Sequence, residues 1–246
     1  MTTIALYNLK GGVGKTASCV NLAYLAAADG YNTLIWDTDQ QGSASYYYKV
    51  KAKQYQYAEA IYAKNAAVKD HILPTTFEHI HILPAVNNST AVHDVNLLLS
   101  NSKNPIKNIL KQVSGTYEFV FIDCPPGFSQ LTQHIIDAVD YVLMPVIPTT
   151  LSVRSYHIVK VYMKENKLDA QKLTCFFTMV DSRKSLHQNV MKELHKDKRF
   201  FNTYIPYLSD VEKMGVYRAP IMEYANSSYA ATCYRQLWAE IKEGLL

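Results

Sequence analysis

The sequence of 246 residues predicts an α/β fold, in which helices flank a doubly wound, mostly parallel β-sheet. Two observations predict it. Short apolar runs recur along the chain and are almost continuously apolar, as expected for strands buried on both faces. Stretches of helical character separate these runs, so strands and helices alternate. No linker rich in Pro, Ser or Gly divides the chain, and no internal repeat is visible, so we expect one domain spanning residues 1–246.

The first forty residues predict a strand, a loop, a helix and a second strand. An apolar run at 3–7 meets a glycine-rich loop, and residues 15–28 are rich in Ala and Leu without Pro or Gly. Such a composition favours a buried helix. Asp29 and Gly30 end it, and 33–36 is the second apolar run. Together these segments predict a βαβ unit with a right-handed crossover.

The rest of the chain continues the alternation. Further strands are expected at 80–83, 119–122, 141–146, 173–177 and 203–205. Helices are expected at 92–99, 105–113, 131–138 and 186–194. The segment 43–76 is rich in Tyr and partly basic, and it predicts no particular element.

Composition excludes several classes of protein. Hydrophobic residues make up 48% of the chain and charged residues 19%, which excludes a disordered protein. The four cysteines are far apart and form no CxxC, so we expect buried, reduced thiols in a cytoplasmic protein. The N-terminus has no signal-peptide pattern, and no run of 18 apolar residues could span a membrane.

The glycine-rich loop predicts a phosphate site. The strict pattern GxxxxGK[ST] fails by one residue, because its first glycine would fall at Leu9. The loop nevertheless lets successive backbone N–H groups converge on an anion, and the helix that follows aims its positive end at the same point. Lys15 can reach the β- and γ-phosphates and the Thr16 hydroxyl can bind Mg²⁺. The residues expected to bind ATP here are Lys10, Gly11, Gly12, Val13, Gly14, Lys15, Thr16 and Ala17.

The run from Lys10 to Thr16 resembles the deviant Walker A box of the ParA/MinD family of P-loop ATPases. In that family the early lysine reaches the phosphates of the partner subunit in a nucleotide-sandwich dimer, which implies the same role for Lys10. A second cation at the γ-phosphate stabilises charge only when two subunits meet. The resemblance therefore implies a homodimer that forms on ATP binding.

Two further motifs follow in the order of the family. The run 37–42 resembles its DxDPQG box, which implies that Asp39 positions the attacking water and that Asp37 lies near Mg²⁺. Gln40 stands where the family usually has Pro, which loosens a turn but removes no chemical group. The apolar run 119–122 delivers Asp123 in the manner of a Walker B strand. The resemblance thus implies Thr16, Asp37 and Asp123 as the metal site, Lys10, Lys15 and Asp39 as catalytic residues, and ATP and Mg²⁺ as cofactors.

The likeness extends into the second half of the chain. By resemblance, the adenine lies between the loop after the strand at 173–177 and the loop after the last strand. The adenine candidates are Met179, Asp181, Pro206 and Tyr207.

Basic residues concentrate after residue 150, where 15 Lys and Arg stand against 10 Asp and Glu. A charge run is usually a solvated helix face, but here it also predicts a surface for the DNA backbone. The candidates are Arg183, Lys184, Lys192, Lys196, Lys198, Arg199, Lys213, Arg218, Arg235 and Lys242.

Together these features predict a Mg-dependent ATPase of the small ParA form, which lacks an N-terminal helix-turn-helix domain. The resemblance implies a nucleoid-associated protein that binds DNA without sequence preference and positions a plasmid, chromosome or protein assembly. A ParB-like or cargo-specific adaptor would stimulate hydrolysis, and no stable membrane association is expected.

Three other functions share parts of this pattern. A MinD-like membrane-cycling ATPase would use an amphipathic C-terminal tail, but the ending has mixed charge and its apolar residues suit a packed helix. An iron–sulfur carrier needs a second cysteine near Cys124, and none follows at the required place. A bacterial tyrosine kinase would carry a clustered tyrosine tail, whereas the 19 tyrosines here are spread along the chain.

Overall fold

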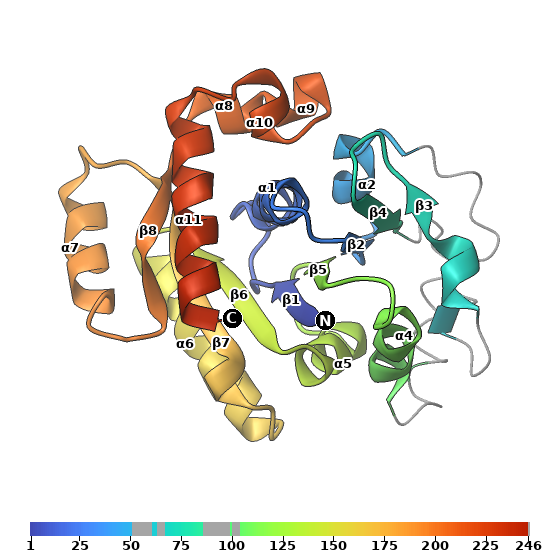
Figure 1. Ribbon diagram of the computed structural model, residues 1–246. Helices are drawn as coiled ribbons and strands as arrows, with labels where there is room; N and C mark the ends of the chain where they lie inside the picture. Colours follow the sequence, from blue (N-terminus) through green and yellow to red (C-terminus); the bar gives the residue numbers. More distant parts are fainter. Residues whose placement is uncertain (51–60, 63–66, 86–98, 100–103, 246) are drawn as a thin grey trace.

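A computed structural model describes residues 1–50, 61–62, 67–85, 99 and 104–245 (Figure 1). Within these residues one eight-stranded sheet has the order β3-β4-β2-β5-β1-β6-β7-β8. Its strands are β1 (Thr2–Leu6), β2 (Thr33–Asp37), β3 (Leu73–Pro74), β4 (Ile80–Leu83), β5 (Phe119–Asp123), β6 (Tyr141–Val146), β7 (Leu173–Val180) and β8 (Phe200–Pro206). All neighbours pair in parallel except β3 and β4, which are antiparallel. The predicted doubly wound α/β fold is confirmed.

Helices cover both faces of this sheet (Figure 1). The longer helices are α1 (Lys15–Ala28), α4 (Pro105–Val113), α5 (Gln130–Ala138), α6 (Thr150–Glu165), α7 (Ser185–Leu194) and α11 (Tyr229–Leu245). Short helices occupy α2 (Ser43–Tyr47), α8 (Ser209–Glu212), α9 (Met214–Tyr217) and α10 (Ile221–Tyr224), and 3₁₀ turns occupy η2 (Val68–His71) and η3 (Ala170–Lys172).

Two hydrophobic cores form because successive side chains of a strand point to opposite faces of the sheet. In β1, Ile4 and Leu6 enter the core that α1 and α11 cover. Ala5, and Tyr7 just beyond the strand, enter the core that α4, α5 and α6 cover. All four side chains are fully buried, which explains why this run is continuously apolar.

Several element boundaries differ from the sequence-based expectation. Strand β8 begins at Phe200 rather than 203, because Phe200 pairs with Cys175 of β7. Helix α6 was not among the predicted helices, and its exposed apolar residues Leu151, Ile158 and Val161 explain why: they break the one-sided pattern of a surface helix. The helix predicted at 92–99 lies outside the described residues apart from Leu99.

The C-terminal apolar residues belong to the core. Leu237, Trp238 and Ile241 of α11 are buried against the α1 face of the sheet. This burial confirms the prediction that the C-terminal segment is a helix packed against the core. In the part of the chain that the structure describes, no helix combines the length and apolar character needed to cross a membrane.

Candidate nucleotide and metal site

The candidate site lies at the carboxyl ends of three adjacent central strands. Strand β1 leads into the glycine-rich loop, β2 ends at Asp37, and β5 ends at Asp123. Asp37 and Asp123 are direct neighbours in the β2–β5 pairing, and Leu6 pairs with Asp123 on the other side. Parallel pairing in this register brings together two motifs from the first forty residues and a third that lies some eighty residues later in the sequence.

The glycine-rich loop is shaped by two backbone conformations that favour glycine. Gly12 has φ +69° and Gly14 has φ +87°, both in the left-handed region. A Cβ at Gly14 would also lie 3.2 Å from Oγ1 of Thr178. Helix α1 begins directly after Gly14 and has neither an acidic residue in its first turn nor a side-chain cap from Gly14. The free N–H groups of that turn, with the helix dipole, suit a phosphate.

Lys15 is held inside this loop. Its side chain is buried, and Nζ donates a hydrogen bond of 2.9 Å to the carbonyl of Lys10. Burial lowers the pKa of Lys15, while the carboxylates of Asp123 and Asp39 and the neighbouring Cys124 oppose that shift. A desolvated cation with one backbone partner is available to bind an anion.

The loop is tied to the segment after β5. Leu9 accepts a hydrogen bond from the Gly127 amide at 3.0 Å, and the Tyr7 hydroxyl donates to the Gly127 carbonyl at 3.1 Å. The Asn8 side chain accepts from the Lys10 amide at 2.9 Å. These hydrogen bonds therefore fix the glycine-rich loop and the loop that follows Asp123 relative to each other.

Asp37 and Asp123 are buried carboxylates with unsatisfied oxygens. Both oxygens of Asp123, and Oδ1 of Asp37, have no hydrogen-bond partner among the described residues. Oδ2 of Asp37 accepts from the amide and the hydroxyl of Ser45, each at 2.8 Å. Burial raises the pKa of Asp37 to about 6. Burial and then the charge of Asp37 raise the pKa of Asp123 well above its usual range, although Thr16 and Lys15 oppose this.

A buried carboxylate oxygen without a hydrogen-bond partner destabilises the folded protein unless a cation binds to it. The Thr16 hydroxyl lies near enough to Asp123 to favour its charged form, without a hydrogen bond of good geometry. Two carboxylates and a hydroxyl are hard oxygen ligands of the kind that Mg²⁺ takes. The residues Thr16, Asp37 and Asp123 therefore fit a divalent cation, with Ser45 fixing the orientation of Asp37.

An open cleft of about 640 Å³ runs along the glycine-rich loop. Gly11, Gly12, Gly14, Lys15, Thr16, Ala17, Asp39, Gln40, Gln41, Ser43, Tyr47, Pro125, Pro126, Met179, Val211 and Glu212 line it. Asp39 accepts a hydrogen bond from the Gln41 amide at 3.0 Å, and its carboxylate remains at the cleft. The loop, Asp39 and Met179 thus share one cleft.

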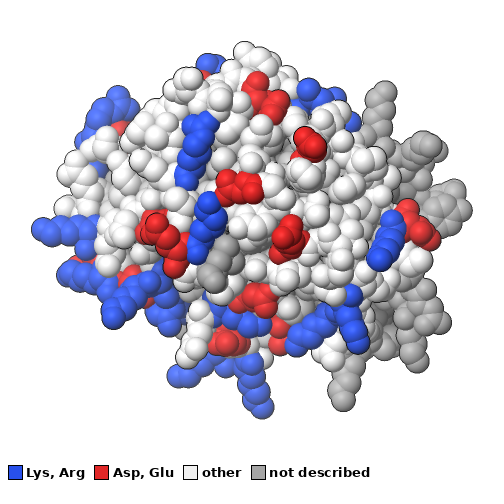
Figure 2. Space-filling model, in the orientation of Figure 1, with Lys and Arg blue, Asp and Glu red and all other residues white. Residues whose placement is uncertain are grey.

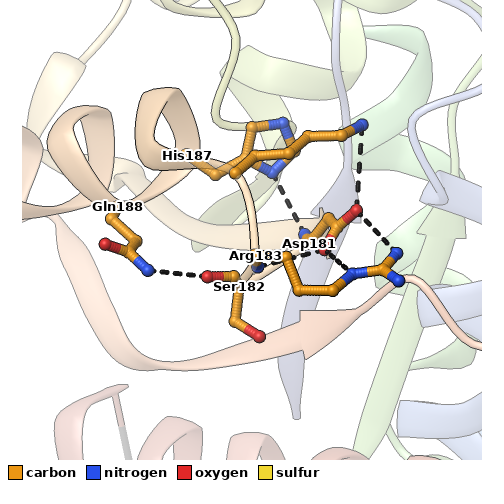
Figure 3. A network of polar contacts seen from close by, with 6 residues as sticks. Asp181, Ser182, Arg183, His187 and Gln188 are labelled. Atoms are coloured by element: carbon orange, nitrogen blue, oxygen red, sulfur yellow. Dashed lines mark hydrogen bonds and ion pairs between the residues drawn. The ribbon is translucent and has the colours of Figure 1, made fainter.

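Of the predicted adenine residues, Met179 lines the cleft and Asp181 is paired within its own loop. Met179 lines the cleft with φ +52°. Asp181 instead pairs with Arg183, whose Nε lies 2.9 Å from Oδ1, and with Lys184 at 4.0 Å, while its amide donates to His187 (Figure 3). The hydrogen bonds from Arg183 lower the pKa of Asp181 to about 2. This carboxylate is engaged with its own loop.

The other two adenine candidates lie at the end of β8. Pro206 is the last residue of that strand, and the exposed Tyr207 donates through its hydroxyl to Glu212 at 2.5 Å. Glu212 and Val211 line the cleft, whereas sequence reasoning named neither. Both residues follow the last strand, and the family resemblance places the adenine beside the loop after that strand. Their position in the sequence could therefore have identified them.

The candidate DNA-contacting residues fall into two groups. Figure 2 shows Lys and Arg side chains gathering along the edge of the molecule where α7 and β8 lie. Lys192 and Lys198 are exposed and have no ion-pair partner among the described residues, and Lys196 is paired only with the exposed Glu193 at 2.7 Å. The remaining candidates are engaged: Arg183 and Lys184 with Asp181, Arg199 with Asp197, Lys213 with Asp210, Lys242 with Asp29, Arg235 with Asn226, and Arg218 with Tyr46.

Asp197 anchors the loop between α7 and β8 to α6. Its Oδ2 accepts from the hydroxyl of buried Tyr156 at 2.5 Å and from Lys160 at 3.3 Å, and its Oδ1 lies 3.2 Å from Arg199. Partial burial alone would raise the pKa of Asp197. The hydrogen bonds from Tyr156, the Arg199 amide and Lys160 outweigh burial and lower the pKa to about 2.

We expect Asp197→Asn to lower the free energy of unfolding by about 1–3 kcal/mol at neutral pH, because it weakens charge-assisted hydrogen bonds to a partly buried carboxylate. The folded-state pKa lies below the unfolded value, so this contribution is present above pH ~4 and is lost as the pH falls toward 2. Urea unfolding at pH 7 and at pH 3 measures both effects. An equal difference between variant and wild type at the two pH values would contradict the assignment.

Comparisons with known proteins agree with this geometry. Residues 1–198 match the family model described as "AAA domain". The chain is 31% identical over 246 residues to the sporulation initiation inhibitor protein Soj of Bacillus subtilis, covering 97% of each chain. It is also 31% identical to the chromosome-partitioning ATPase Soj of Treponema pallidum, covering 97% of this chain and 96% of that protein.

Solved structures share the fold. The septum site-determining protein MinD of Pyrococcus horikoshii, solved with Mg-ADP, superposes with a TM-score of 0.79 at 20% identity, covering 98% of this chain and 96% of that one. The family match over 198 residues and the near full-length Soj relatives, together with a glycine-rich loop facing two buried aspartates, show that the chain belongs to the ParA/MinD family of P-loop ATPases.

Proposed function

We propose that this protein is a ParA-type ATPase that binds Mg-ATP in the cleft along its glycine-rich loop. The observation that carries the proposal is the meeting of a buried lysine at a helix N-terminus with two buried aspartates whose oxygens lack partners. The family relatives include a chromosome-partitioning ATPase, and a structure of the same fold holds Mg-ADP. ATP and Mg²⁺ are the ligands that this charge arrangement suits.

Each residue has a proposed task in the reaction. Lys15 and the first-turn amides of α1 bind the β- and γ-phosphates, since they offer the positive charge at the cleft. Thr16, Asp37 and Asp123 hold Mg²⁺, which neutralises phosphate charge when bound. Asp39, which lines the same cleft, orients the attacking water. Lys10 acts across a dimer, stabilising charge on the phosphates of the second subunit.

The direct test is binding of a fluorescent ATP analogue with Mg²⁺ and with EDTA, followed by phosphate release. Tight Mg-dependent binding and slow hydrolysis are the expected results. The absence of nucleotide binding by the wild-type protein would overturn the proposal. Light scattering at saturating Mg-ATP adds the test of the dimer.

We further propose that the ATP-bound dimer binds DNA without sequence preference through the basic edge formed by Lys192, Lys196 and Lys198. Two subunits double the cations within one footprint, and each phosphate neutralised releases counterions, so affinity rises steeply on dimerisation. A ParB-like or cargo-specific adaptor would stimulate hydrolysis and free the DNA. The protein would then position its cargo on the nucleoid, within the cytoplasm.

We expect the double variant Lys192→Glu/Lys198→Glu to weaken DNA binding by about tenfold or more, because each reversal replaces a backbone contact with repulsion. The matched control is Lys69→Glu/Lys111→Glu, two exposed lysines that likewise have no ion pair among the described residues but lie elsewhere. Fluorescence anisotropy with two unrelated duplexes, with ATP and with ADP over a salt series, measures the effect. Equal losses in both pairs, or equal binding with ADP, would contradict the proposed surface.

A further inference from the structure

Arg218 makes an internal contact that its charge alone does not predict. Its Nε donates a hydrogen bond of 3.1 Å to the carbonyl of Tyr46, and its guanidinium lies 4.2 Å from the centre of the Tyr46 ring. The Tyr46 hydroxyl in turn donates to the carbonyl of Gly215 at 3.4 Å. These three contacts join helix α2 to the segment around α9, which lies some 170 residues later in the chain.

The backbone of Arg218 supports a specific role. It has φ +50° and ψ 55°, in the left-handed region that disfavours residues other than glycine. Glycine would adopt this conformation without strain, but it would provide neither the hydrogen bond nor the stacked cation. The Arg218 side chain therefore provides a hydrogen bond and a stacked cation that the backbone conformation of the turn does not require.

Helix α2 needs support from outside. It has five residues, too few to be stable alone, and it has no basic residue in its last turn. A cation at the last carbonyls of a helix offsets the negative end of its dipole. Arg218 supplies that cation from the far end of the chain, while Tyr48, buried just after α2, anchors the helix to Val20 by a hydrogen bond of 2.9 Å.

Helix α2 controls one carboxylate of the candidate metal site. Ser45, in its middle, donates both of its hydrogen bonds to Oδ2 of Asp37, leaving Oδ1 without a partner among the described residues. Ser43 and Tyr47 of the same helix line the nucleotide cleft. A displacement of α2 would therefore turn the Asp37 carboxylate and alter the cleft wall together.

We infer that Arg218 is a positioning residue for the Mg²⁺ site, acting on Asp37 through Tyr46 and Ser45 rather than through contact with DNA. The inference rests on the proposed binding of Mg-ATP. It assigns the stacked guanidinium to the support of α2, so that Mg²⁺-dependent nucleotide affinity depends on a residue outside the cleft. Substitution of Arg218 should then weaken the Mg²⁺ contribution and spare the phosphate contacts made by the glycine-rich loop.

The test uses Arg218→Gly, since glycine relieves the backbone strain and the variant should fold. A fluorescent ATP analogue is titrated at a series of Mg²⁺ concentrations and in EDTA. We expect the Mg²⁺ concentration at half-maximal binding to rise about fivefold, as the loss of a stacked, charge-assisted hydrogen bond implies. Affinity in EDTA should stay within twofold of wild type. Arg218→Lys keeps the charge without the planar stack, so its Mg²⁺ concentration at half-maximal binding should lie between those of wild type and Arg218→Gly.

Lys167→Gly is the matched control, because Lys167 is an exposed cation at φ +57° just after α6, away from the cleft. It removes the same charge and relieves the same strain, and its Mg²⁺ dependence should equal that of wild type. Tyr46→Leu, which removes the ring but keeps the backbone carbonyl, should reproduce part of the Arg218→Gly effect.

The outcomes separate the inference from the function on which it rests. If the wild-type protein binds no nucleotide, the proposed function fails. If wild type binds Mg-ATP and Arg218→Gly shows the same Mg²⁺ dependence, the positioning role fails while the function stands. A loss of DNA affinity with unchanged Mg²⁺ dependence would overturn the inference in favour of a DNA contact.

Discussion

We expect Lys15→Met to abolish ATP binding at micromolar concentrations, with an affinity loss of about 100-fold or more, equal to ~2.7 kcal/mol. Lys15 is the buried cation at the N-terminus of α1, and in the proposed function it binds the phosphates through a charge-assisted contact, which its own burial strengthens. Methionine keeps an unbranched apolar side chain of nearly the same length and removes the ammonium. Isothermal titration calorimetry with Mg-ATP measures the loss.

Folding of the Lys15→Met variant is the necessary control. Burial lowers the pKa of Lys15 in the free protein, so the buried ammonium destabilises the folded protein when no nucleotide is bound. The melting temperature without nucleotide should therefore equal or exceed that of wild type, while stabilisation by Mg-ATP disappears. Wild-type affinity in a well-folded variant would refute the assignment of the glycine-rich loop.

We expect Asp39→Ala to separate binding from hydrolysis. Asp39 lies at the cleft and its carboxylate accepts one hydrogen bond, from the Gln41 amide, so removal of the carboxylate leaves no buried charge without a partner. The hydrolysis rate should fall by about 100-fold or more, the usual scale for losing a group that activates or orients the nucleophile. ATP affinity should remain within a few-fold, and ATP should accumulate in a stable dimer.

Phosphate release and light scattering on the same sample measure the two effects. Asp70→Ala, at an exposed acid of the turn η2, should keep the wild-type rate. Asp39→Asn should also slow hydrolysis, because a neutral amide oxygen accepts a weaker hydrogen bond from the attacking water than a carboxylate does. A monomeric Asp39→Ala protein with ATP bound would contradict the sandwich dimer, and an undiminished rate would contradict the role of Asp39.

Local sequence patterns predicted the central part of the fold. The apolar runs identified seven of the eight strands in the described part of the chain, because most of these strands are buried on both faces and contain few polar residues. The same patterns failed for α6, whose apolar residues Leu151, Ile158 and Val161 face solvent. They also passed over β3, a two-residue strand that exists only because β4 offers it an edge.

The candidate site divides in a similar way. Residues that act through a backbone shape or follow a strand directly, such as Gly14, Lys15 and Asp123, were predicted from the chain alone because short-range sequence determines where they lie. The cleft residues Val211 and Glu212 were not, because a loop after the last strand reaches the site only through the folding of the whole sheet.

Short stretches of sequence were enough to predict the glycine-rich loop, the aspartates that end β2 and β5, and the class of fold, since each depends on contacts between near neighbours or on burial. Which acidic or aromatic partner each cation contacts depends on the folded chain. The tertiary structure placed Lys242 on Asp29, Lys160 on Asp197 and Arg218 on Tyr46, and it left Lys192 and Lys198 free of ion pairs among the described residues. The physical reason is that a long cationic side chain takes whichever partner the fold brings within about 4 Å, and linear sequence does not carry that distance.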